Sequence, residues 1–321
     1  MRLSSKKSFS YAKYGYIFSI PFIIIYLIFH LYPTLYTAVL GFTDCKGLGN
    51  TNWHFLKQGE IWKNFDTILK NPSFKFSLKN TLKIWTMNFI PQITLALLLS
   101  AWFTSRRNKI RGQGFFKVVF YMPNIITAAT VAVLFSQLFG YPRGPANDLL
   151  TKGISIGSWQ IIKPALEKAH NFTVDKAGSQ YIVAFIQFWQ WYGYTMIVLI
   201  SGILGINPEI YEAAEIDGAN DRQIFFNITL PNLRTILLYT LITSMIGGLN
   251  MYDIPKLYLN GGPDNATLTT NVFIYKQAFS GSYLYNRAAA ASMIMFVIIA
   301  ICSAFVFFLM RDKKGGKKRP W

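Results

Sequence analysis

The chain has 321 residues, of which 52% are hydrophobic, 17% aromatic and only 14% charged, with a net charge of +18. An average soluble domain is roughly 25% charged, and a soluble protein with this many large apolar side chains would expose patches that aggregate. The composition therefore argues against a disordered chain, a disulfide scaffold and a cytosolic globular enzyme, and it favours a membrane protein.

Six segments are long and apolar enough to cross a membrane, which takes about 20 mostly apolar residues. They cover residues 16–40, 82–103, 115–139, 181–204, 233–252 and 288–310. The pattern predicts an all-α membrane protein with six transmembrane helices in one domain, residues 16–310. Basic residues precede the first segment as in a signal peptide, but its apolar stretch is too long for one, so we expect it to be retained.

The basic residues predict the orientation of these helices. Three short segments carry +13 of the net charge, namely residues 1–13, 104–114 and 311–321. If the helices alternate in direction, the other side of the membrane receives three longer loops, residues 42–79, 140–180 and 253–286. Short, densely basic segments stay in the cytoplasm. We therefore expect cytoplasmic basic tails at residues 1–15 and 311–321, and we interpret the net charge as an orientation signal, not as a nucleic-acid-binding surface.

One predicted cytoplasmic loop, residues 205–232, breaks this pattern because it is acidic. Five of the chain's 14 acidic residues fall between Glu209 and Asp221, and within the loop only Arg222 opposes them. A loop that is merely tolerated in the cytoplasm should be basic. The residues alone leave two interpretations open, a solvated connector between two helices and a docking element for another protein.

The same loop should fold as two short helices. Asn207 is a favourable N-cap and Pro208 suits the first helical position, while Gly218 can take the left-handed conformation that ends a helix. A second helix is expected at residues 222–228, capped by Asn220 or Asp221 and ended by Leu230-Pro231.

Residues of this loop follow a spaced motif, Glu212-Ala213-Ala214, Gly218, Ile228 and Leu230-Pro231. The motif resembles that of permease subunits of binding-protein-dependent ABC importers, with three residues between Ala214 and Gly218, nine before Ile228 and one before Leu230. The resemblance extends over the whole chain and is closest to the sugar-transporting branch, similar to the maltose permease subunits. Other stretches that resemble this branch are Phe42-Thr43-Asp44, Leu78-Lys79-Asn80-Thr81, Asn260-Gly261-Gly262-Pro263 and the Thr-rich residues 267–270.

The resemblance implies that the helix pair docks into a groove of a separate cytosolic ATPase and couples its movements to the transmembrane helices. The residues implied in this coupling are Glu212, Ala213, Ala214, Asp217, Gly218, Ala219, Ile228, Leu230 and Pro231. The chain has no GxxxxGK[ST] phosphate-binding loop. ATP and Mg are therefore expected on the ATPase, with no cofactor bound by this chain and no enzymatic activity of its own.

The resemblance also implies the partners and the location. It predicts a multi-pass protein of the bacterial cytoplasmic membrane that pairs with a second permease subunit in a heterodimer, with two ATPase subunits, and with an extracellular or periplasmic sugar-binding protein. The outer segments 140–180 and 253–286 are candidates for docking that binding protein. Nucleic acid is not an expected partner.

The transmembrane segments contain neutral polar and aromatic side chains but no mid-span basic residue. Amides in hydrocarbon need hydrogen-bond partners or a wet cavity, and a cavity of amides and aromatic rings suits a neutral carbohydrate. Aligned on the motifs, the resemblance implies a substrate site made of Gln190, Trp191, Tyr194, Ser244, Gly248, Asn250, Met251 and Tyr252. Trp191 and Gly248 differ in size from the maltose permease pattern, which leaves the sugar open. Asn88, Gln92 and Asn124 are explained equally well as substrate contacts and as links between helices.

Other functions find less support. A glycerol phosphate cargo should require mid-span basic residues and a polyamine cargo mid-span acidic residues. A secondary transporter driven by ions should show ionisable groups at the midplane or inverted repeats, and a membrane scaffold leaves the acidic loop unexplained.

The two cysteines, Cys45 and Cys302, lie at different expected depths, and the three histidines are scattered, so no disulfide or metal site is expected.

Overall fold

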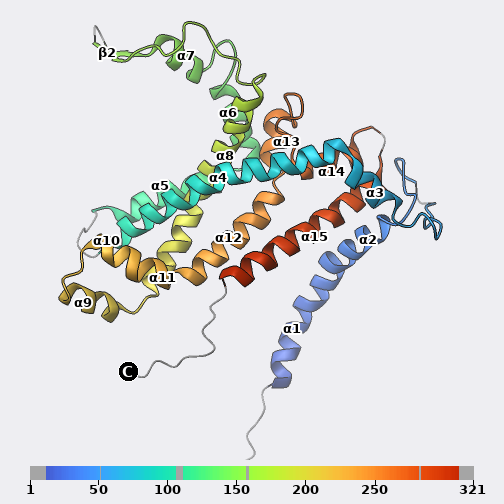
Figure 1. Cartoon of the computed structure of the whole chain (residues 1–321), viewed down its shortest axis with the longest axis horizontal. Helices are drawn as coiled ribbons and strands as arrows, with labels where there is room; N and C mark the ends of the chain where they lie inside the picture. Colours follow the sequence, from blue (N-terminus) through green and yellow to red (C-terminus); the bar gives the residue numbers. More distant parts are fainter. Residues whose placement is uncertain (1–11, 51, 106–110, 157–158, 282, 311–321) are drawn as a thin grey trace, which may run out of the picture. The chain divides into compact units, whose positions relative to one another are not determined.

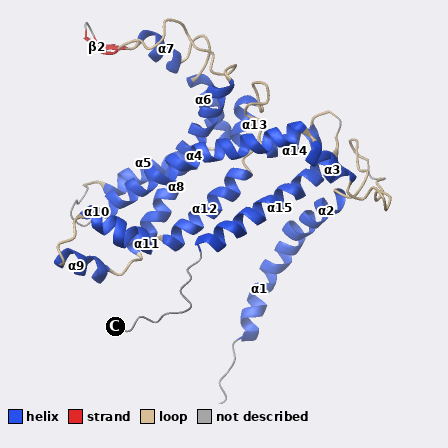
Figure 2. Ribbon diagram, viewed as in Figure 1, coloured by secondary structure: helices blue, strands red, loops and turns tan. Residues whose placement is uncertain are grey.

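The computed structural model describes residues 12–50, 52–105, 111–156, 159–281 and 283–310, and its regular structure is almost entirely helical (Figures 1 and 2). The elements are α1 (Ala12–Tyr26), η1 (Leu27–Leu31), α2 (Tyr32–Leu40), α3 (Lys63–Lys70), α4 (Pro72–Thr104), α5 (Gln113–Ile125), α6 (Ala128–Leu138), α7 (Pro145–Lys152), β1 (Ile154–Ile156), β2 (Trp159–Ile162), α8 (Lys176–Leu204), α9 (Pro208–Ile216), α10 (Asp221–Ile224), η2 (Phe225–Thr229), α11 (Leu230–Asn232), α12 (Arg234–Leu249), α13 (Asp253–Leu259), α14 (Thr270–Phe279) and α15 (Tyr285–Met310). The described residues pack as two units, one within residues 12–68 and 277–294 and one within residues 69–276 and 295–310.

The predicted helical class and the positions of the apolar segments are confirmed. In the described part of the chain, five helices are long and apolar enough to cross a membrane, and the bent pair α5–α6 makes a sixth if it counts as one span. Most of the basic residues used to predict the orientation, in both tails and at residues 106–110, lie outside the described residues.

The first unit contains a helix with a π-helical turn directly before a proline. The segments α1, η1 and α2 follow one another without a break, and Pro33 lies at the start of α2. The Tyr32 N–H donates to the carbonyl of Leu27, five residues back, at the end of η1. A proline has no N–H and its ring crowds the preceding turn, so the wider π-turn lets the helix continue through Pro33.

Buried amides hold the other parts of the first unit together. Asn64 of α3 donates from Nδ2 to the carbonyls of Gly41 and Thr43 at 2.9 and 2.8 Å. Asn286, at the start of α15, donates from Nδ2 to Asn64 Oδ1 at 3.1 Å. The Phe42-Thr43-Asp44 stretch therefore lies at the centre of a polar network that links the end of α2, α3 and the start of α15.

The long helices α4 and α8 form the centre of the second unit. Helix α8 packs against α4, α5, α12 and α13. One buried cluster includes Ile84 of α4 with Val183 and Ile186 of α8, and another joins Ala96 of α4 to Met196 of α8. Both helices thus bury apolar side chains along much of their length, which fixes the framework that carries the polar residues between them.

The third predicted segment, residues 115–139, was expected as one helix, and this expectation is wrong. The structure has α5 and α6 with a bend of 93° between them (Figure 1). Ile126 has an extended backbone, and the Thr127 side chain accepts from the Thr130 N–H and caps α6. Pro123, which cannot donate a backbone hydrogen bond, weakens the last turn of α5. Helix α5 then packs on α8. Helix α6 packs mainly on α13, and its Phe135 ring also meets Phe185 and Trp189 of α8 edge to face.

The fifth predicted segment, residues 233–252, is confirmed as part of a candidate membrane span, Arg234–Leu259, and the structure adds a break within it. Helix α12 ends at Leu249, and a short helix, α13, follows after a break at residues 250–252. The break does not fall at the Gly247-Gly248 pair, which remains helical. Two carbonyls freed by the break are bonded by side chains, because Asn271 Nδ2 donates to Asn250 O at 2.8 Å and Thr269 Oγ1 donates to Met251 O at 2.9 Å.

The loop after α13 is held by buried amides of α4 and α8. Asn80 Nδ2 donates to the carbonyls of Asn265 and Leu268 at 2.8 and 3.3 Å. Gln180 Nε2 donates to Ala266 O at 2.7 Å, and Lys83 Nζ donates to Gln180 Oε1 at 2.6 Å. The Leu78–Thr81 and Asn260–Thr270 stretches that resemble the sugar branch are therefore direct hydrogen-bonding partners.

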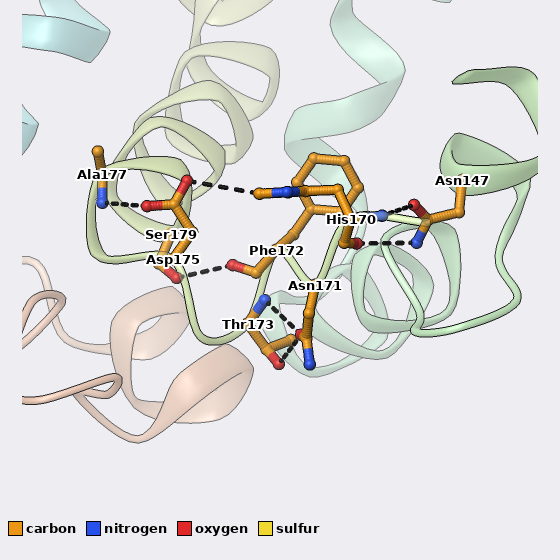
Figure 3. A network of polar contacts seen from close by, with 8 residues as sticks. All are labelled: Asn147, His170, Asn171, Phe172, Thr173, Asp175, Ala177 and Ser179. Carbon is orange, nitrogen blue, oxygen red and sulfur yellow. Dashed lines mark hydrogen bonds and ion pairs between the residues drawn. The ribbon is translucent and has the colours of Figure 1, made fainter. Parts of the chain in front are cut away.

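The segment of residues 140–180 has regular structure that the sequence did not predict, namely α7 and an antiparallel pair, β1 and β2. Figure 3 shows how it joins α8. Asn147 bonds the backbone of His170 in both directions, with the His170 N–H donating to Asn147 Oδ1 at 2.8 Å and Asn147 Nδ2 donating to His170 O at 3.1 Å. The Asp175 side chain caps α8 and lies 3.5 Å from His170 Nε2.

Candidate functional site

A cavity of about 510 Å³ lies in the second unit, between α4, α8, α12 and the break that precedes α13. It is lined by all eight residues predicted for the substrate site: Gln190, Trp191, Tyr194, Ser244, Gly248, Asn250, Met251 and Tyr252. They come from two helices and one broken connection, so the fold brings together two stretches about fifty residues apart in sequence. The prediction that these residues share one site agrees with this geometry, and their role in binding a substrate stays a prediction.

The α8 side of the cavity combines an amide with two aromatic rings. Gln190 is 8% exposed, and its Nε2 lies 3.5 Å from the carbonyl of Ile126 at the α5–α6 bend. The rings of Trp191 and Tyr194 meet edge to face, with centroids 5.9 Å apart. Edge-to-face packing fixes the orientation of both rings and gives the cavity a stable apolar corner.

The α12 side of the cavity ends in non-helical backbone at residues 250–252. Irregular backbone at membrane depth is tolerated where it is bonded to protein or lines a cavity, and both conditions hold here. Met251 is 5% exposed and packs in the cluster with Ile84 and Val183. Tyr252 packs against Tyr275 of α14 with ring centroids 5.4 Å apart. The break therefore has a fixed shape.

Further residues line the cavity beyond the eight that the resemblance implied as its substrate site. Helix α4 contributes Trp85, Asn88 and Gln92, and other contributions come from Asn124, Tyr239, Thr240, Thr243 and Asp253. Trp85, Asn88 and Gln92 are three and four residues apart, so they share one face of a helix. That spacing was visible in the sequence, but only the structure shows that the shared face turns toward α8 and α12.

Two of the amides that had two possible roles also link helices. Gln92 Nε2 donates to Thr195 Oγ1 at 2.8 Å, which joins α4 to α8. Asn124 Nδ2 donates to the carbonyl of Gln190 at 3.2 Å, which joins α5 to α8. Both residues line the cavity as well. Hydrogen bonds of this kind stabilise helix pairs in a membrane. Gln92 and Asn124 therefore hold together the helices that form the cavity walls.

The charge of the cavity limits what it can bind. Among the described residues that line it, Asp253 is the one charged side chain, and none is a lysine or arginine. The other polar groups are amides and hydroxyls, which donate and accept hydrogen bonds without a net charge. With its aromatic rings, this lining suits an uncharged polar molecule that has apolar faces.

The acidic loop folds as a pair of short helices, as predicted. Asn207 caps α9 by accepting from the Glu209 N–H at 3.1 Å, and Pro208 occupies the first turn. Gly218 follows α9 with a φ of +79°, the left-handed region that favours glycine. Asn220 then caps α10 in a reciprocal bond with Gln223, so Asn220, not Asp221, is the cap.

The second helix of the pair does not end at Leu230-Pro231, which corrects the prediction. Helices α10, η2 and α11 run without a break to Asn232. The Leu230 N–H donates to the carbonyl of Phe225, five residues back, and Pro231 follows directly. The π-turn accommodates the proline as η1 does before Pro33.

The nine residues predicted for coupling fall on the two helices and the turn between them. Glu212, Ala213 and Ala214 lie on α9, Asp217, Gly218 and Ala219 lie in the turn, and Ile228, Leu230 and Pro231 lie on η2 and α11. The turn is closed by a bond from the Ala219 N–H to Ala214 O at 2.9 Å. Glu212 and Gly218 are exposed, whereas Ala214 is buried.

A hydroxyl contact links the two helices of the pair, and a cavity lies beside them. The hydroxyl oxygens of Tyr211 and Thr229 lie 3.2 Å apart and link α9 to η2. A second cavity of about 430 Å³ separates the pair from the ends of α4 and α8, and Trp102, Glu215 and Phe225 are among the residues that line it.

The described residues contain no group of three or more His, Cys, Asp or Glu side chains that could hold a metal ion. The structure therefore defines a multi-helix apolar protein with an exposed acidic helix pair and a polar cavity, in which Asp253 is the one charged residue of the described lining.

The chain belongs to the family described as binding-protein-dependent transport system inner membrane component, which matches residues 76–313. It is similar to the lactose transport system permease protein LacF of Rhizobium radiobacter, with 29% identity over 94% of this chain and 95% of that protein. It is also similar to the arabinooligosaccharides transport system permease protein AraP of Bacillus subtilis (strain 168), with 28% identity over 94% of this chain and 89% of that protein.

A solved structure shares the fold. It is a bacterial ABC transporter involved in the import of the acidic polysaccharide alginate, whose matching chain has a TM-score of 0.76 and 22% identity, with 93% of this chain and 95% of that chain covered. A second structure of a bacterial alginate ABC transporter, in complex with an alginate pentasaccharide-bound periplasmic protein, matches with a TM-score of 0.70 and 22% identity over 92% of this chain and 93% of that chain.

Proposed function

We propose that this chain is a transmembrane subunit of an ATP-driven importer that moves a neutral oligosaccharide by alternating access. The observation that carries the proposal is the cavity between α4, α8 and α12. Its lining offers amides and hydroxyls for sugar hydroxyl groups and indole and phenol rings for the apolar faces of a sugar. The relatives named for lactose and for arabinooligosaccharides support a sugar as the cargo.

A neutral sugar fits the lining better than the acidic polysaccharide of the solved relatives. A uronate would bring a carboxylate close to Asp253 without a lysine or arginine among the described lining residues. A buried, unpaired charge is costly. The same argument disfavours a glycerol phosphate cargo.

The proposal includes the topology predicted from the charges. Both tails are cytoplasmic, six helices span the bacterial cytoplasmic membrane, and the helix pair of residues 205–232 faces the cytoplasm. The membrane location is supported by the family, an inner membrane component, and by the apolar helices.

The helix pair is proposed to couple this chain to a separate ATPase subunit that binds ATP and Mg. Its exposed carboxylate at Glu212 and its tight turn at Gly218 form a projecting element suited to a groove on another protein. The remaining partners are a second permease subunit, a second ATPase subunit and an extracellular or periplasmic sugar-binding protein. The segments of residues 140–180 and 253–286 are the proposed docking region for that binding protein.

Sugar uptake tests this proposal in cells that lack the chain and are complemented with it. Wild-type protein should restore uptake of at least one labelled neutral sugar from a panel of lactose, arabinotriose and diacetylchitobiose, and it should not restore uptake of an alginate trisaccharide. E212K should abolish uptake at an unchanged amount of protein in the membrane, whereas E60K, the same substitution at an exposed residue of the segment of residues 42–79, should not.

The cavity needs its own variant in the same cells. Y194A should raise the KM for the imported sugar without loss of protein from the membrane. Y181A is the matched control, because Tyr181 is on the same helix but is 63% exposed and does not line the cavity. Restored uptake of alginate alone, or full uptake by E212K, would contradict the proposal.

A further inference from the structure

We infer that Trp85 is a wall of the sugar site that selects which sugars fit, and that Gly248 and Ser244 hold its indole in position. The inference rests on the proposed function and extends it to a residue on α4 that neither the motif nor the family match assigns. Trp85 lines the cavity and is half-buried, so part of its ring is open to a bound molecule.

The backbone of Gly248 sets the position of the indole. A Cβ at position 248 would overlap indole Cδ1 of Trp85 and would lie 2.7 Å from Cγ and 2.8 Å from Nε1. These atoms are close to the tryptophan backbone and cannot move away as the end of a flexible side chain can. Any residue other than glycine at position 248 must therefore push the indole to a new place.

Two further contacts fix the same ring. Trp85 Nε1 donates to Ser244 Oγ at 3.3 Å, one helical turn before Gly248 on α12. This bond satisfies the indole N–H, the one polar group of the side chain. The ring also stacks on Phe89, one turn along α4, with centroids 5.5 Å apart and planes inclined by 20°. The Gly248 backbone, the Ser244 hydroxyl and the Phe89 ring thus all restrain the indole.

The indole shares a face of α4 with two cavity amides, Asn88 and Gln92. An aromatic surface beside hydrogen-bonding amides is the arrangement that a sugar ring requires, with its apolar face on the indole and its hydroxyls toward the amides. Because the ring is fixed, a sugar with a substituent that collides with it is excluded. A rigid wall of this kind discriminates by shape as well as by affinity.

Uptake by the complete transporter in proteoliposomes, driven by ATP and its binding protein, tests the inference. The measured quantities are KM and kcat for lactose, arabinotriose and diacetylchitobiose. W85A should raise the KM of the preferred sugar about tenfold, as truncation of a buried aromatic contact typically does, and should change the order of preference among the three sugars. W85F, which keeps a ring, should retain more of the wild-type preference than W85A.

Gly248 is tested through its dependence on Trp85. G248A should change the sugar preference when Trp85 is present, and the W85A/G248A double variant should behave as W85A alone, because no indole is left to displace. G247A is the matched control, since it adds the same methyl group to the same helix where no atom lies within 4 Å. Any effect of G247A on the sugar preference should be the same in the wild-type and the W85A backgrounds.

The outcomes separate the inference from the proposed function. Two results would overturn the inference and leave the proposed function standing. One is wild-type KM and sugar preference in W85A, and the other is a G248A effect that persists fully when Trp85 is replaced by alanine. If the wild-type complex hydrolyses ATP but imports no neutral sugar, the proposed function and the inference both fail. Size-exclusion profiles and basal ATP hydrolysis establish that each variant is assembled.

Discussion

Gly193 of α8 lies directly against the backbone of Phe120 in α5. A Cβ at position 193 would overlap the Phe120 carbonyl oxygen and would lie 2.9 Å from the Cα of Tyr121. The neighbour is backbone, which cannot move aside without displacing the whole helix. The close contact of α5 with α8, and with it the start of the bend that leads to α6, therefore depends on the missing side chain at position 193.

G193A should accordingly destabilise the protein. Overpacking against a rigid neighbour costs about 1–3 kcal/mol, so we expect a lower unfolding temperature in detergent and a smaller yield of monodisperse protein. G247A carries the same change to a position with open space around it and should unfold close to the wild type. Equal unfolding temperatures for the two variants would show that α5 and α8 can separate at no cost.

The hydrogen bond between Gln92 and Thr195 should contribute to stability as well as to the cavity wall. Its donor and acceptor are 2.8 Å apart and both side chains are buried. A double-mutant cycle of Q92L and T195V should give an interaction energy of about 1 kcal/mol in thermal unfolding, within the range measured for such bonds in membranes. Additive effects of the two substitutions would mean that the bond adds nothing to stability.

Gly218 should be required for its backbone conformation. Its φ is +79°, and no atom lies within 4 Å of an added Cβ, so any defect of G218A comes from backbone strain and not from a clash. A left-handed residue with a side chain costs roughly 1–2 kcal/mol, and asparagine tolerates this region better than most. Uptake should therefore decrease in the order wild type, G218N, G218V.

G205A is the control for this series. Gly205 closes α8 with a φ of −81°, and a Cβ there meets its neighbours at ordinary distances of 3.5 Å and more. G205A should keep wild-type uptake. Equal uptake by G218N and G218V would contradict a conformational role for Gly218.

Cys45 should resist thiol reagents. Burial, with a smaller contribution from the Asp44 carboxylate, raises the pKa of the Cys45 thiol. Because the thiolate is the reactive form, the thiol is protected at neutral pH both by access and by protonation. In a C302A background, N-ethylmaleimide should label Cys45 slowly at pH 7.5, faster as the pH rises and fully after denaturation, as peptide mass spectrometry can measure. D44N should lower the pKa and raise the rate, and rapid labelling of the folded protein at pH 7.5 would contradict this account.

The local features of the helix pair could be predicted because each depends on residues a few positions apart. The Asn207 cap, Pro208 in the first turn and the left-handed Gly218 follow from side-chain reach and backbone sterics. The end of the second helix was missed because the π-turn at Phe225–Thr229 is a cooperative distortion around Pro231, and a residue-by-residue pattern predicts a break there.

The α5–α6 bend was missed for a different reason. Residues 115–139 are mostly apolar, and the hydropathy of a segment does not show whether its helix bends. The bend is stabilised by tertiary partners, since Asn124 bonds Gln190 O, α5 packs on α8, and α6 packs mainly on α13. None of these partners is local in sequence.

By itself, the sequence determined that this is a helical membrane protein, where its apolar segments lie and which loop carries the acidic motif, because length, apolarity and short-range capping are properties of contiguous residues. The tertiary structure decided that Trp85 of α4 meets Gly248 of α12, and that two distant stretches and the break at residues 250–252 enclose one cavity. The shape of that cavity depends on how closely helices approach, and this is set by contacts between atoms more than a hundred residues apart in the chain.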